Sequence, residues 1–101
     1  MRNVILTYDI EGDSEGLHQI LNSYLTKICG YSEYIQASGG KWCKLPASTL
    51  IKGNTSSNTV ADEFEQACHM VEVRYRRYIA TEYARSALDS DIILDKLPES
   101  K

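Results

Sequence analysis

The chain opens with an almost continuous apolar run over residues 4–10, Val-Ile-Leu-Thr-Tyr-Asp-Ile, and a turn-forming segment follows at residues 11–14. Runs of β-branched and aromatic residues bounded by turn formers are typical of strands. A strand that is apolar on both faces is typical of the centre of a sheet. We therefore expect a central strand over residues 3–10, with the carboxylate of Asp9 at its C-terminal end.

Apolar residues recur at helical spacing in two later segments. Residues 14–29 form the first, in which Glu15 suits the first turn and Gly30 suits a left-handed stop. Residues 59–70 form the second, with Thr59 as its expected cap. The expected core combines the first strand with the two helical stripes: Val4, Ile5, Leu6, Leu17, Ile20, Leu21, Leu25, Ile28, Phe64, Cys68 and Val71.

Short β-prone segments lie between the two helices. Residues 31–38 predict a second strand, which Gly39 and Gly40 end. Trp42 and Cys43 predict either a short strand or a bulge. Residues 48–52 predict a third strand, and the polar residues 53–58 predict a loop.

Residues 71–88 contain neither glycine nor proline and allow two interpretations. They continue the helical period of the preceding segment, but residues 75–83 also alternate and are rich in aromatic side chains, as in a strand. A helix over residues 59–88 would be far longer than the average of about 11–12 residues. We therefore favour a strand at residues 75–83.

The resulting order, strand-helix-strand-strand-helix-strand, is that of a ferredoxin-like α+β fold. It predicts a four-stranded antiparallel sheet with two helices on one face. A chain of 101 residues corresponds to one domain, residues 1–101. The apolar residues in the tail, residues 89–101, predict packing on a sheet edge or on a second subunit.

Composition narrows the classes of function. Eleven Lys and Arg against fourteen Asp and Glu give a net charge of −3, which argues against a dedicated nucleic-acid binder. No apolar stretch reaches the roughly 18 residues of a membrane span. The cysteines, Cys29, Cys43 and Cys68, form no C-x-x-C pair, which is typical of a reduced, cytoplasmic protein with buried thiols.

Acidic residues cluster directly after the first strand at Asp9, Glu11 and Asp13. Carboxylates at alternate positions around Gly12 suit a hard cation such as Mg²⁺ or Mn²⁺, with Asp9 and Asp13 as the expected ligands. The same residues also suit a polar turn that complements the dipole of the following helix. Both interpretations remain open.

A basic and aromatic cluster lies near the expected last strand, at Arg74, Tyr75, Arg76 and Arg77. Arginines interleaved with tyrosines suit phosphate contacts and base stacking, so this segment is the candidate site for RNA or DNA. It equally suits a solvent-facing strand beside an acidic helix.

Several features together resemble a known family. The aliphatic strand ending in Tyr8-Asp9, the amphipathic helix, Gly30 and the segment Gln36-x-Ser38 resemble the small CRISPR adaptation subunit and the related virulence-associated D-type toxin ribonucleases. The resemblance covers residues 3–38 and the expected topology. It implies a defence or toxin–antitoxin setting, with Asp9 at a dimer interface as a catalytic, metal-binding residue.

Two functions follow as hypotheses. The first is a dimerising module that binds a protein partner, which the acidic charge and the single basic residue of the first helix, Lys27, favour. The second is a metal-dependent nuclease that uses Asp9. A homodimer is expected under either hypothesis, because a sheet with helices on one face leaves the other bare. We expect aromatic side chains on that bare face, from Tyr8, Tyr34, Trp42 and Tyr83.

Overall fold

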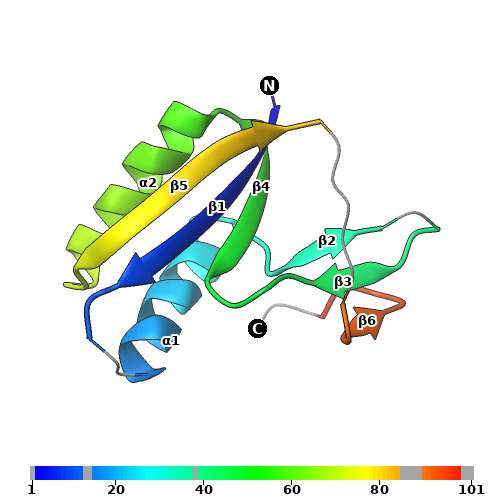
Figure 1. Cartoon of the computed structure of the whole chain (residues 1–101), viewed down its shortest axis with the longest axis horizontal. Helices are drawn as coiled ribbons and strands as arrows, with labels where there is room; N and C mark the ends of the chain where they lie inside the picture. Colours follow the sequence, from blue (N-terminus) through cyan, green and yellow to red (C-terminus); the bar gives the residue numbers. More distant parts are fainter. Residues whose placement is uncertain (1, 13–14, 38, 85–89, 99–101) are drawn as a thin grey trace.

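The computed structural model describes residues 2–12, 15–37, 39–84 and 90–98. The larger of its two antiparallel sheets has the strand order β4-β1-β5 (Figure 1). Its strands are β1 (Arg2–Ile10), β4 (Thr49–Thr55) and β5 (Tyr75–Tyr83). The central position expected for the first strand is confirmed.

A second three-stranded sheet lies beyond one end of the first (Figure 1). It has the order β2-β3-β6, with β2 (Tyr34–Gln36), β3 (Trp42–Lys44) and β6 (Ile93–Leu94). The short strand expected at residues 42–43 is therefore present as β3. The described part of the tail pairs with the outer edge of this strand through β6, where Leu94 lies opposite Trp42.

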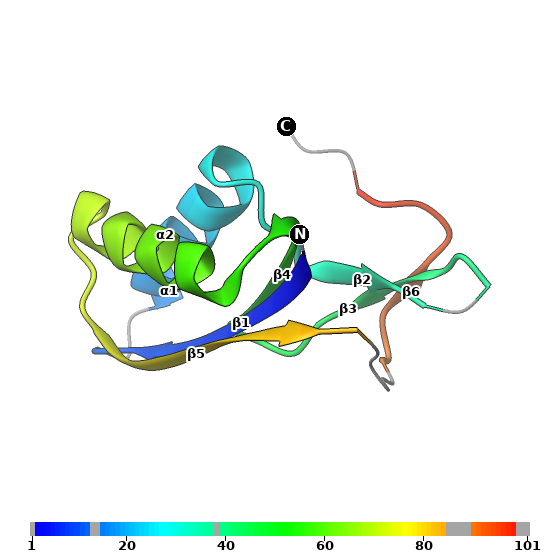
Figure 2. The ribbon, with the colours of Figure 1, turned by 90° about the horizontal axis from the view of Figure 1, so that it is seen from above.

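Two helical segments cover one face of the first sheet (Figure 2). The first is α1 (Glu15–Ser23), which continues as a π-helical segment, η1 (Tyr24–Ile28), and the second is α2 (Ser57–Met70). None of the described helices combines the length and apolar character needed to cross a membrane. The main core lies between these helices and β1, and its fully buried side chains include Val4, Leu6, Leu21, Leu25, Leu50, Val60 and Phe64.

The expected single four-stranded sheet of a ferredoxin-like fold is wrong, because the chain forms two separate three-stranded sheets. Of the described residues 31–37, only Ser32 bridges to β4, through reciprocal main-chain bonds with Ile51 of 2.9 and 3.0 Å. The chain then turns at Gly39 and Gly40, which both have positive φ, and pairs β2 with the nearby β3. Such a local hairpin closes a shorter loop than a long-range pairing would.

The strand favoured at residues 75–83 is confirmed as β5, and the long-helix alternative is wrong. The chain leaves the helix through Glu72, a non-glycine residue in the left-handed region with φ of 58°. The start of α2 also differs from expectation. Ser56, rather than Thr59, caps the helix, since its hydroxyl accepts a bond from the Thr59 main-chain N–H at 3.2 Å.

Two residues of the expected core are exposed instead: 52% of Ile20 and 69% of Ile28 is accessible. For Ile28 the cause is the π-helical segment, in which the Cys29 N–H donates to the Tyr24 carbonyl five residues earlier. The wider turn changes the phase of the apolar stripe, so Leu25 stays buried while Ile28 turns outward. Ile20 lies at the edge of the apolar stripe of α1, and Leu21 lies at its centre.

Candidate interaction surface and polar cleft

The face of the first sheet opposite the helices carries a set of β-branched side chains, which we call the outer face. Along β1, residues alternate between the two sides of the sheet. Val4 and Leu6 are buried under the helices, whereas Ile5 and Thr7 lie on the outer face. Strand register extends the outer face across the sheet in two rows: Thr49, Thr7 and Ile79, then Ile51, Ile5 and Thr81.

No described helix or strand lies over the outer face (Figures 1 and 2). Ile79 is 58% exposed, while Ile5, Thr7 and Ile51 are half-buried only by their neighbours in the sheet. β-Branched residues pack well on pleated surfaces, and the inner faces of stacked sheets are built in this way. The outer face is therefore chemically suited to packing against a second protein surface.

Asp9 lies on this outer face, at the C-terminal end of β1 and directly opposite Arg77 of β5. Its Oδ2 is 3.6 Å from the Arg77 Nε, and the two side chains are 61% and 74% exposed. Asp9 is thus mostly exposed at the end of β1, where it lines a hollow with Arg76, Arg77 and His18 of α1.

The expected metal site finds little support in the described geometry. Among the residues that the structure describes, no three His, Cys, Asp or Glu side chains are grouped to hold a metal ion. Asp13, the second expected ligand, lies outside the described residues. Glu11 is held by its main chain, whose N–H donates to the Arg74 carbonyl at 2.7 Å. With Arg77 rather than a second carboxylate beside Asp9, a bound Mg²⁺ or Mn²⁺ would take its other oxygen ligands from water, a substrate phosphate or a second copy of the chain.

The expected nucleic-acid residues are divided, because Arg76 and Arg77 line one hollow with Asp9 whereas Tyr75 packs elsewhere. Tyr75 lies toward the helices, with its ring 5.5 Å from Phe64 and 5.2 Å from Tyr78. Arg77 lies on the opposite side, beside Asp9. Arg74 is exposed and precedes β5. Arg76 lies at a register shift, between Tyr75, which pairs with Ile10, and Arg77, which pairs with Asp9.

Of the four aromatic residues expected on the bare face, three lie elsewhere. Tyr83 is on the outer face, opposite Asn3. Tyr8 is buried beneath the helices, with its ring 5.0 Å from Phe64, because the alternation of β1 turns it inward. Tyr34 and Trp42 belong to the second sheet. The outer face therefore carries Tyr83 at one end and is otherwise formed mainly by isoleucine and threonine.

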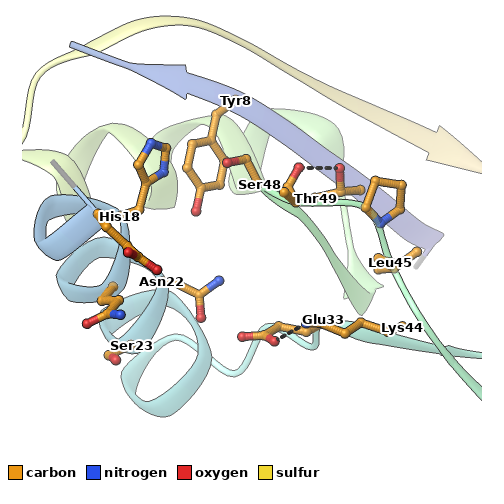
Figure 3. A pocket seen from close by; sticks show the side chains of 13 residues that line it. Tyr8, His18, Asn22, Ser23, Glu33, Lys44, Leu45, Ser48 and Thr49 are labelled. Atoms are coloured by element: carbon orange, nitrogen blue, oxygen red, sulfur yellow. Dashed lines mark hydrogen bonds and ion pairs between the residues drawn. The ribbon is translucent and has the colours of Figure 1, made fainter. Parts of the chain in front are cut away.

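A polar cleft of about 540 Å³ opens between α1 and the segment 45–49, which connects β3 to β4. Figure 3 shows Tyr8 extending from β1 toward α1, with His18 and Asn22 extending from α1 into the same space. Glu33 and Lys44 close one end as an ion pair of 2.7 Å. Sequence analysis did not predict this cleft, because its residues come from four separate segments.

Tyr8 forms the buried floor of the polar cleft and is only 4% exposed. Burial raises the pKa of its phenol to about 12, and a side-chain hydrogen bond with Asn22 partly opposes that change. Its main-chain N–H donates to the Ser48 carbonyl at 3.2 Å, and Ser48 itself has φ of 58°. The hydroxyl of Tyr8 is thus a neutral donor held in a fixed position at neutral pH.

The cysteines match the expected buried thiols at two positions. Cys43 and Cys68 are buried, and Cys29 is half-buried. Burial raises the pKa of the Cys68 thiol to about 11 and also raises that of Cys29. A raised thiol pKa means little reactive thiolate at neutral pH.

No protein-family model, curated protein or solved structure matches this chain. The resemblance to the CRISPR adaptation subunit and the toxin ribonucleases therefore rests on the sequence features alone and stays a prediction.

Proposed function

We propose that the chain acts as a homodimerising protein-interaction module whose interface is the outer face of the first sheet. The observation that supports this most directly is the pair of β-branched rows centred on Ile5 and Thr7, which neither helix covers. Three isoleucines and three threonines form these rows, and β-branched surface of this kind suits packing against a second sheet.

The charge on the outer face supports a second copy as the partner. The two β-branched rows contain no charged residue, and Asp9 and Arg77 beyond them have opposite signs. A two-fold interface pairs the same surface with itself, so a patch of one sign would repel its mate. A neutral centre with a balanced ion pair at one end avoids that repulsion.

The nuclease alternative is less well supported. It requires Asp9 as a metal ligand, and Arg77 already lies 3.6 Å from its carboxylate. The acidic net charge of −3 and the division of the arginine and tyrosine cluster between two sides of the sheet also disfavour a nucleic-acid substrate.

Light scattering on two matched variants tests the proposed interface. Ile79→Lys places a charge on the outer face at the β5 end of one row, where Ile79 is 58% exposed. Ile28→Lys makes the same change at a 69% exposed position on the helical side. We expect dimers for the wild type and Ile28→Lys and monomers for Ile79→Lys. A dimer that survives Ile79→Lys but not Ile28→Lys would overturn the proposal.

A further inference from the structure

The polar cleft borders the outer face at Thr49 and has the dimensions of a small-molecule site. Its volume of about 540 Å³ lies within the range of roughly 300–1,000 Å³ that is usual for ligand pockets. One wall is a single face of α1, the opposite wall is the segment 45–49, and the floor is Tyr8 (Figure 3). The main-chain bond from the Tyr8 N–H to the Ser48 carbonyl joins the floor to the segment 45–49.

The hydrogen-bonding groups of the cleft are mostly uncharged. Tyr8 offers a buried hydroxyl, and Asn22 offers an amide that both donates and accepts. Gln19 and Ser48 add a second amide and a second hydroxyl at the walls. This set matches a ligand that presents donors and acceptors next to one another. Asparagine and glutamine amides recognise the edges of nucleobases in this paired manner.

The charged groups of the cleft disfavour an anionic ligand. Glu15 and Glu33 both line it, while its one lysine, Lys44, lies 2.7 Å from Glu33. The ammonium group of Lys44 is therefore already neutralised, and an incoming phosphate would meet the carboxylate of Glu15 without a free lysine to balance it. An uncharged ligand avoids this cost.

The remaining surface of the cleft is aliphatic. Leu45 and Pro46 form an apolar part of the wall opposite α1. The ring of Tyr8 packs on Phe64 and is almost fully buried, so Tyr8 presents its hydroxyl rather than a stacking face. A flat heterocycle can lie against Leu45 and Pro46 while its edge reaches Asn22.

We propose that the polar cleft binds an uncharged nucleoside, with the base edge hydrogen-bonded to Asn22 and Tyr8 and the base face packed on Leu45 and Pro46. Among the residues that line the cleft, Thr49 also belongs to the outer face, so the proposed dimer would border this site at the start of β4.

Two-dimensional ¹H–¹⁵N NMR on the full chain tests the site. Adenosine, guanosine, cytidine and uridine are each titrated, in parallel with their 5′-monophosphates and with glucose. We expect at least one nucleoside to give saturable shifts centred on Tyr8, Asn22 and Ser48, and its monophosphate to bind at least tenfold more weakly. Asn22→Ala should weaken nucleoside binding at least tenfold, whereas Asn58→Ala, at an exposed position of α2, should leave it unchanged.

Several results would contradict nucleoside binding in the polar cleft. Absence of saturable shifts with all four nucleosides up to their solubility limits would overturn the proposal, as would shifts centred away from the cleft or equal binding of glucose. Stronger binding of the monophosphate would overturn the charge argument and with it the ligand class. If Asn22→Ala does not fold, Tyr8→Phe decides, because it removes the hydroxyl but keeps the ring contact with Phe64.

Discussion

Asp9 and Arg77 face each other across neighbouring strands, with 3.6 Å between the Asp9 Oδ2 and the Arg77 Nε. This pairing places the carboxylate that ends β1 on the open side of the sheet rather than under the helices. The charged group nearest to the Asp9 carboxylate is therefore the Arg77 guanidinium, whereas a metal-dependent nuclease would need further oxygen ligands beside Asp9.

The first prediction concerns this pair. When RNA or DNA is incubated with Mg²⁺ or Mn²⁺, the wild type and Asp9→Asn should give the same result. A neutral amide is a poorer ligand for a hard cation, so the substitution would reduce cleavage only if Asp9 bound such a cation. Both side chains are mostly exposed, so Asp9→Asn should change the free energy of unfolding by less than about 1 kcal/mol. Metal-dependent cleavage by the wild type that Asp9→Asn abolishes would instead establish the nuclease alternative.

The second prediction concerns Glu63, which joins three segments. It accepts a hydrogen bond from the Tyr31 hydroxyl at 2.8 Å and one from the Lys52 ammonium at 3.0 Å. These contacts connect α2 to β4 and to the chain after η1, at side chains about two-thirds or more buried. Glu63→Ala should lower the free energy of unfolding by about 1–3 kcal/mol, because it leaves both donors without this acceptor.

Urea unfolding followed by circular dichroism measures that change, and Glu72→Ala, at an exposed position after α2, is the matched control. Equal stability of the Glu63→Ala and Glu72→Ala variants would show that the contacts of Glu63 contribute nothing to the fold.

The third prediction concerns stability at alkaline pH. Burial raises the pKa of Tyr8 from 10.0 to about 12 and that of Cys68 from 9.0 to about 11. The folded chain keeps these protons to higher pH than the unfolded chain does, so the free energy of unfolding should fall as pH rises from about 9 to about 12. A difference of two in pKa corresponds to about 3 kcal/mol for Tyr8.

Urea unfolding at successive pH values measures this loss. Tyr8→Phe should show a shallower decline above pH 10, because the substituted ring carries no titratable proton. Identical pH profiles for the wild type and Tyr8→Phe would contradict the burial of the Tyr8 phenol in the folded protein.

The sequence predicts the first sheet and its helices better than the second sheet. The apolar alternation of β1 and the stripes containing Leu21 and Phe64 report directly on burial, so local pattern is sufficient there. The hydrophobic pattern of β2 does not by itself specify its partner strand. Either β4 or β3 can pair with this segment, and the turn at Gly39 and Gly40 selects β3.

The positions of the candidate-site residues also follow only in part from local sequence pattern. The outer-face position of Ile5 and Thr7 follows from strand alternation, but their exposure depends on which side the helices cover. The polar cleft was missed because Tyr8, Asn22 and Glu33 come together only through tertiary packing. One available signal was the polar face of α1, on which His18 and Asn22 are four residues apart.

The central claim is that two copies of the chain meet through the outer face, and isotope-filtered NMR tests it most directly. Isotope-labelled and unlabelled protein are mixed, and only contacts between different protomers are recorded. We predict intermolecular contacts from the methyl groups of Ile5, Ile51 and Ile79. Intermolecular contacts from Ile28 or Ile93 instead, or no intermolecular contacts together with a solution mass of 11.4 kDa, would contradict the claim.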